Sequence, residues 1–158
     1  MRMLPFCMRR LALYSFVITL LWLGFVGAIS FLEAPLKFKA PGVALKDALS
    51  IGRLVFHALN RMEWISAVLS WLILLRLRVV RTRGALLLLG SITAILLFQT
   101  FALLPVLDAR ALVIVRGGES AATWHHMAYI VADVVKAILL GLLASAQIQS
   151  FARAVISE

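Results

Sequence analysis

Four polar side chains share one face of an otherwise apolar segment in the C-terminal part of the chain. They are spaced by three, four and three positions: His126, Tyr129, Asp133 and Lys136. At about 100° per residue, this spacing places them within roughly 80° of one another on a helix. A carboxylate and an amine on an apolar helix could bind a proton, an ion or a small polar solute, and they need a partner elsewhere in the chain.

The expected partner is a second apolar segment with polar interruptions at 57–63. At 1.5 Å per residue from the expected cytoplasmic ends of the two helices, Glu63 and Lys136 lie about 18 and 16 Å deep. Arg61 and Asp133 both lie at about 21 Å by the same measure. The depths predict the ion pairs Glu63–Lys136 and Arg61–Asp133, which form a neutral set.

Two interpretations of this buried set are open. The functional one is a polar cavity between the second and fourth helices, open from the outer side, that binds or passes an ion, a proton or a small solute. The structural one is a salt-bridge network that fixes which helices meet. The candidate site residues are Asn60, Arg61, Glu63, Asp133 and Lys136, with His57, His126 and Tyr129 at the mouth.

Two further features also have alternative explanations. His57 and His126 are expected near the outer membrane boundary on adjacent helices, where they could ligate haem or a transition metal. Histidine is also a common interfacial residue, so no cofactor is the leading expectation. Ser66 and Ser70 continue the Glu63 face, and they either line a path inward or hydrogen-bond between helices.

The elements that must position these residues are membrane-spanning helices. Hydrophobic residues make up 63% of the 158 residues, and the mean hydropathy is +1.03. A soluble domain is roughly 45–50% apolar. The sequence predicts an all-α, four-helix transmembrane bundle that forms a single domain, 1–158, with spans at about 11–32, 54–76, 85–104 and 124–147.

The ends of these spans predict the topology and the loops. Pro35 and Pro105 are expected to end the first and third helices, because proline cannot continue a regular helix. The outer loop at 108–123 is expected to turn at Gly117-Gly118. The two halves each have a helix, a proline, an outer loop and a histidine-bearing helix, so they suggest a weak two-hairpin repeat.

The net charge of +9 follows the same topology. Arginine concentrates at the ends expected in the cytoplasm, and lysine and arginine are fewer in the outer loops. The inner set is Arg2, Arg9, Arg10, Arg76, Arg78, Arg81, Arg83 and Arg153. The outer set is Lys37, Lys39, Lys46, Arg110 and Arg116, or six residues with Arg53. Both termini are therefore expected inside a bacterial inner membrane, with contact to anionic lipid and no nucleic-acid partner.

Three short segments resemble a bacterial membrane-protein family with a domain of unknown function. They are Leu21-Trp22-Leu23-Gly24, Glu33-Ala34-Pro35-Leu36-Lys37-Phe38 and Gly52-Arg53-Leu54-Val55-Phe56. That family also includes a eukaryotic transmembrane protein linked to resistance to platinum drugs. The resemblance implies a polytopic four-helix membrane protein and implies no activity.

The leading functional hypothesis is therefore a small integral membrane protein with an ion-binding or solute-binding polar cavity. The alternatives are an accessory subunit of a larger membrane complex and a haem-binding or metal-binding membrane protein, and a homodimer fits any of them. The chain has no phosphate-binding loop, nucleophile elbow or dinucleotide motif, so an enzyme is not expected.

Overall fold

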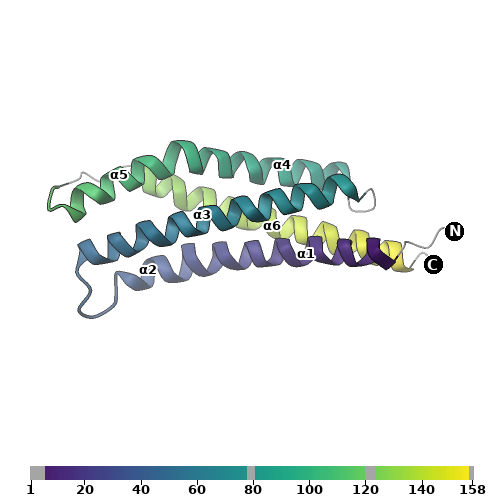
Figure 1. The fold of residues 1–158 in the computed structure, drawn as a ribbon, viewed down its shortest axis with the longest axis horizontal. Helices are drawn as coiled ribbons and strands as arrows, with labels where there is room; N and C mark the ends of the chain where they lie inside the picture. Colours follow the sequence, from purple (N-terminus) through teal and green to yellow (C-terminus); the bar gives the residue numbers. More distant parts are fainter. Residues whose placement is uncertain (1–5, 78–80, 120–123, 157–158) are drawn as a thin grey trace.

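The computed structural model describes residues 6–77, 81–119 and 124–156, and these form a bundle of four long helical segments (Figure 1). The elements are α1 (Phe6–Val26), η1 (Gly27–Glu33), α2 (Ala34–Lys37), α3 (Leu45–Arg76), α4 (Arg83–Phe98), η2 (Gln99–Leu103), α5 (Leu104–Val115) and α6 (Trp124–Ile156). Four segments are long and apolar enough to cross a membrane: Arg10–Lys37, Leu45–Arg76, Arg83–Val115 and Trp124–Arg153. The predicted all-α four-helix fold is confirmed.

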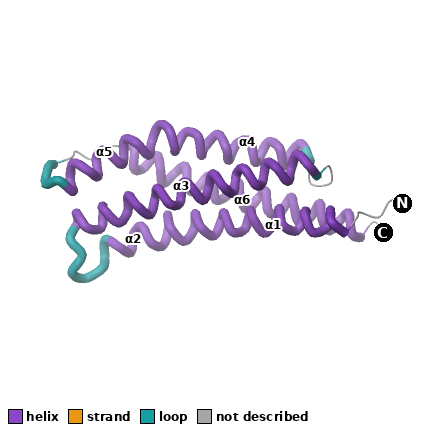
Figure 2. Tube along the Cα trace, in the orientation of Figure 1, coloured by secondary structure: helices purple, strands orange, loops and turns teal. Residues whose placement is uncertain are grey.

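The four segments form a ring in which α3 and α6 face each other across the bundle axis. Helix α1 packs against both α3 and α6, and α4 packs against the same two helices from the other side. Both termini lie at one end of the bundle with the α3–α4 connection, and we refer to this as the termini end (Figures 1 and 2). The α2–α3 loop and α5 lie at the opposite end, the α5 end.

The helices are longer than the predicted spans, and Pro35 and Pro105 do not end them. Each proline follows a π-helical segment, η1 or η2, and the helix continues beyond it as α2 or α5. The residue before each proline donates its N–H five positions back, from Ala34 to Ile29 and from Leu104 to Gln99. This wider turn makes room for a proline ring that would clash with the carbonyl in a regular α-helix.

The predicted loop at 108–123 is therefore wrong over its first half, because α5 runs to Val115, and its last part, 120–123, lies outside the described residues. The expected glycine turn does follow it. Gly117 has a φ of +87°, and the Gly117 and Gly118 N–H groups bond back to the carbonyls of Ile114 and Val113. This is the arrangement in which a left-handed glycine closes a helix.

The termini end has an apolar core and exposed arginines on its surface. Buried apolar residues of all four segments form one cluster, which includes Trp22, Ala67, Leu74, Leu96 and Leu143. Five of the eight arginines predicted for this end have exposed, described side chains: Arg10, Arg76, Arg81, Arg83 and Arg153. Arg2, Arg78 and the side chain of Arg9 lie outside the described part of the chain.

Candidate functional site

A buried ion pair joins the two diagonal helices at the middle of the bundle. Lys136 Nζ of α6 lies 2.6 Å from Glu63 Oε1 of α3, and both side chains are completely buried. The predicted Glu63–Lys136 pair is therefore present. Because α3 and α6 are not packed side by side, the two long side chains meet on the bundle axis rather than in a cleft between neighbours.

Asp133 and Gln99 complete the contacts of the Lys136 ammonium. Lys136 Nζ lies 2.9 Å from Asp133 Oδ1, one turn earlier on α6. It also donates to Gln99 Oε1 at 2.5 Å, and Gln99 Nε2 donates to Asp133 Oδ1 at 2.8 Å. The amide of Gln99 thus uses both of its ends to bind the lysine and the aspartate.

Trp22 adds a fourth segment to the cluster. Its indole Nε1 donates to Glu63 Oε1 at 3.1 Å. Each membrane-crossing segment therefore contributes to one central polar cluster, and all of its side chains are at most 1% exposed: Trp22, Glu63, Gln99, Asp133 and Lys136. A charge at this depth costs about 2.5–3.5 kcal/mol on insertion scales, and these contacts offset that cost.

The central cluster contains two acids and one base. With the three ionisable groups in their usual forms, two carboxylates surround one ammonium, and the sum is −1. Glu63 Oε2 and Asp133 Oδ2 are buried and find no hydrogen-bond partner among the described residues. The hydroxyl of the nearby Tyr129, which is 3% exposed, is in the same state. Two carboxylate oxygens are thus free to hold a proton or a cation.

The predicted Arg61–Asp133 pair is wrong. Arg61 is exposed on α3, and Asp133 is bound to Lys136 and Gln99 instead. Positions 61 and 63 of a helix point about 200° apart, so Arg61 and Glu63 cannot both face the axis. The hydrocarbon core of a membrane is about 30 Å thick, and a helix rises 1.5 Å per residue. If one edge of that core lies at Arg76, the other edge lies near residue 56 of α3. An exposed arginine close to that boundary can extend its guanidinium to the lipid headgroups.

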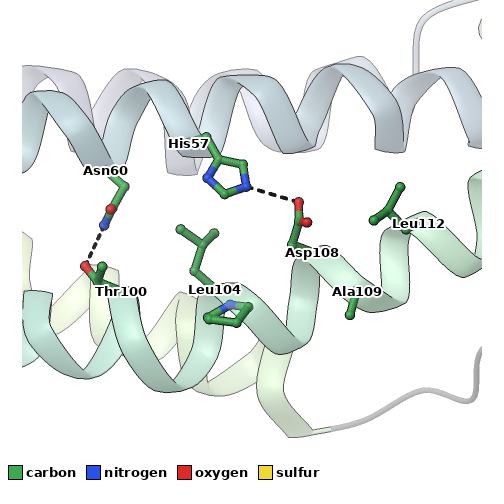
Figure 3. A pocket seen from close by; sticks show the side chains of 8 residues that line it. His57, Asn60, Thr100, Leu104, Asp108, Ala109 and Leu112 are labelled. Atoms are coloured by element: carbon green, nitrogen blue, oxygen red, sulfur yellow. Dashed lines mark hydrogen bonds and ion pairs between the residues drawn. The ribbon is translucent and has the colours of Figure 1, made fainter.

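A second polar group fastens α5 to α3 near this boundary. Asp108 of α5 accepts two hydrogen bonds from the Arg53 guanidinium, at 2.7 and 3.0 Å. His57 Nε2 lies 3.1 Å from Asp108 Oδ1 (Figure 3). His57 therefore faces α5, and its binding partner is a carboxylate rather than a second histidine.

An open groove lies between α3 and α5 beside this contact. Its volume is about 450 Å³, and it is lined by His57, Asn60, Thr100, Leu104, Pro105, Asp108, Ala109 and Leu112 (Figure 3). At its inner end, Asn60 Nδ2 donates to Thr100 Oγ1 at 2.8 Å. Asn60 is one helical turn from Glu63, and Thr100 follows Gln99, so these two lining residues are the ones nearest in sequence to the central cluster, whose own residues do not line the groove.

His126 does not join this site. It is exposed on α6, which lies diagonally across the bundle from the helix that carries His57, so the two histidines are not on adjacent helices as predicted. Among residues 6–77, 81–119 and 124–156, no three His, Cys, Asp or Glu side chains gather in a way that could hold a metal ion.

Lys37 and two aromatic rings lie between the α2–α3 loop and the central cluster. Lys37 Nζ pairs with Glu33 at 3.2 Å and lies 5.1 Å from the centre of the Phe56 ring. Phe56 in turn packs edge-on against Tyr129, with ring centres 5.5 Å apart. A Cβ on Gly52 would lie 2.7 Å from Lys37 Nζ, so glycine at this position makes room for the ammonium. These contacts join α2, α3 and α6 on the side of the cluster toward the α5 end.

Removing the charge of Asp108 should loosen α5. The pair is partly exposed, so we expect Asp108→Asn to weaken the attachment by about 1 kcal/mol, which corresponds to roughly fivefold faster hydrogen exchange of α5 amides. Hydrogen–deuterium exchange of 104–115 by mass spectrometry measures this. The matched control is Asp47→Asn, an exposed aspartate at the start of α3. Unchanged exchange in α5 would show that Asp108 does not fasten it.

Comparisons of the chain with known proteins give no match to a family model, to a curated protein or to a solved structure. The family resemblance of the sequence therefore rests on its three short segments alone.

Proposed function

We propose that this chain is a multi-pass membrane protein whose central polar cluster binds one positive charge, a proton or a monovalent cation. The observation that carries the proposal is the charge balance of the cluster. Two carboxylates and one ammonium are almost completely buried, and one oxygen of each carboxylate has no partner among the described residues. A bound proton or cation would neutralise the cluster and occupy one of these oxygens.

The cost of an unbalanced buried charge supports this proposal. A buried ion pair is tolerated when each charge is compensated, and an uncompensated one costs several kcal/mol in the folded protein. The structural alternative needs only a neutral set of charges. A network that served packing alone could use a single carboxylate for Lys136, so the second carboxylate is the feature that favours ion binding.

The groove between α3 and α5 supports access to the cluster from the α5 end. It places His57 and Asp108 at its outer part and Asn60 and Thr100 at its inner end. The Thr100 hydroxyl there is occupied by Asn60, Trp64 and the Leu96 carbonyl, so the Asn60 amide is the group that can exchange hydrogen bonds with water or with a hydrated cation. An ion entering by this route would reach Glu63 within one helical turn of Asn60.

The arginine distribution supports a location in the bacterial inner membrane with both termini in the cytoplasm. The exposed arginines of the termini end include the three at positions 76, 81 and 83, which border the short α3–α4 connection. Short basic connections stay on the cytoplasmic side. With this orientation the groove would open to the outer side.

Asp133→Asn tests the bound charge directly. The amide keeps the shape of the side chain and brings the formal charge of the cluster to zero, so the variant should fold normally and lose the binding. Infrared spectroscopy of the purified protein reports the state of the carboxyl groups. In the wild type we expect either a protonated carboxyl band that shifts in D2O or a carboxylate band that shifts when Na⁺ or K⁺ replaces a large organic cation.

Whichever of these two signals the wild type shows should vanish in Asp133→Asn and in Glu63→Gln, and persist in the exposed control Asp47→Asn. A wild-type protein that shows neither signal would contradict the proposal. So would an Asp133→Asn variant that retains the wild-type signal. A large drop in the amount of folded Asp133→Asn protein would instead support the structural network and an accessory role in a complex.

A further inference from the structure

We propose that a second polar path connects the central cluster to the termini end, so that the bound charge passes through the bundle rather than only entering and leaving by the groove. This inference rests on the proposed function, because it assigns an exit to the same site. The path consists of five buried polar residues on α1, α3 and α6, which we call the polar column: Ser15, Thr19, Ser66, Ser70 and Gln147.

The column continues the inner faces that carry the cluster. On α1, Thr19 and Ser15 lie three and seven residues before Trp22, and both are completely buried. On α3, Ser66 and Ser70 lie three and seven residues after Glu63. The two helices run in opposite directions, so both series lead from the Trp22–Glu63 contact toward the termini end, over about 10 Å.

A third helix contacts the column at the side nearest the termini end. Gln147 of α6 donates from Nε2 to Ser15 Oγ at 2.8 Å. Hydroxyl and amide groups from three helices therefore contribute to one side of this stretch of the bundle. Hydroxyls can relay protons or hold water, and here those of Thr19 and Ser66 donate to the backbone carbonyls of Ser15 and Met62. Buried apolar side chains of α4 and α6 fill the other side of this stretch: Ile92, Leu96, Leu140 and Leu143.

Unused hydrogen-bonding groups distinguish this column from ordinary contacts between helices. Ser70 Oγ and Gln147 Oε1 are buried and find no partner among the described residues, and their side chains are 1% and 3% exposed. A buried polar group without a partner costs about 1–3 kcal/mol, so these atoms indicate positions that take up water or a passing ion. Glu63 Oε2, where the column meets the central cluster, is also buried without a hydrogen-bond partner among the described residues.

An apolar layer separates the column from the termini end. This layer contains the buried residues Ala12, Leu74 and Leu77, which are nearer the termini end than Ser15 and Ser70. Ser70 lies six residues before Arg76, so the layer is about 9 Å thick. We infer that this layer is the gate of the second path, and that the groove at the α5 end is the mouth of the first.

Cysteine accessibility tests the second path in proteoliposomes. The chain has a single cysteine, Cys7, so Cys7→Ser provides a background without thiols. Ser70→Cys is then treated from each side with a charged, membrane-impermeant methanethiosulfonate reagent. Arg153→Cys and Lys39→Cys, both at exposed positions, mark the termini end and the α5 end.

The matched control is Ala67→Cys. Ala67 is as buried as Ser70 and lies on the same helix next to Ser66, and it packs in the apolar cluster. We expect Ser70→Cys to react from the same side as Arg153→Cys, at least about tenfold faster than Ala67→Cys, because modification requires a hydrated thiolate. Ser66→Cys provides a second reporter if Ser70→Cys does not fold.

Equal rates at Ser70→Cys and Ala67→Cys, or reaction only from the side marked by Lys39→Cys, would overturn the second path. The infrared test of the central cluster is independent of this result. A bound charge at Glu63 and Asp133 together with an unreactive Ser70→Cys would leave a binding site with one entrance. Loss of the infrared signal would remove the site itself.

Discussion

Lys136→Met is expected to leave little folded protein. The ammonium of Lys136 contacts Glu63, Asp133 and Gln99, and no other cation touches the cluster within the described residues. Removing one partner of a buried ion pair costs about 3–5 kcal/mol, because the remaining charge stays buried without compensation. Here two carboxylates lose their common partner. Unfolding in mixed micelles with an increasing fraction of SDS measures the loss of stability.

A triple variant separates charge from packing in this experiment. Adding Glu63→Gln and Asp133→Asn to Lys136→Met makes the cluster neutral at nearly constant volume, and we expect it to recover most of the lost stability. Lys46→Met, at an exposed position of α3, should behave like the wild type. A stable Lys136→Met single variant, or a triple variant as unstable as the single one, would show that electrostatic balance does not hold the bundle centre together.

The Glu63–Lys136 pair could be predicted because helix geometry fixes depth. Each residue adds 1.5 Å along the axis, so counting from the ends of two helices brings the correct acid and base to one level. Counting depth does not reveal which helices are neighbours. The pair was expected between adjacent helices, and it forms across the diagonal because both side chains are long enough to reach the bundle axis.

The predicted Arg61–Asp133 pair failed because it used the depth of each residue in the membrane and ignored the helix face on which each side chain lies. Arg61 and Asp133 are at matching depths, but Arg61 is two residues from Glu63 and points away from it. Asp133 finds its cation on its own helix, three residues away. A check of helical phase, in addition to depth, would have excluded Arg61.

Two members of the cluster were missed for different reasons. Gln99 is the one strongly polar side chain in the apolar sequence 85–104, and that isolation was a usable signal. Trp22 gave none, because tryptophan counts as apolar and one N–H group is not visible in a hydropathy pattern. The groove could not be predicted either, since it depends on how η2 and Pro105 direct α5 beside α3.

Trp22→Ala is expected to be the most destabilising change on α1. The side chain is completely buried, and it is the largest such residue in the described part of the chain. Replacing a buried tryptophan with alanine typically costs about 3–5 kcal/mol, mainly through the cavity that is left. The loss should be seen as unfolding at a lower fraction of SDS. Trp124→Ala, at a position that is 65% exposed, removes the same side chain without a cavity and should have little effect.

Trp22→Phe divides this loss between packing and the indole–carboxylate contact. Phenylalanine keeps most of the ring volume and removes the N–H group that Trp22 donates to Glu63 at 3.1 Å. A hydrogen bond to a charged group contributes about 1.5–3 kcal/mol, so we expect Trp22→Phe to lose about half as much stability as Trp22→Ala. A Trp22→Phe variant as stable as the wild type would show that Trp22 only fills space. The central cluster would then depend on three of the four segments rather than on all of them.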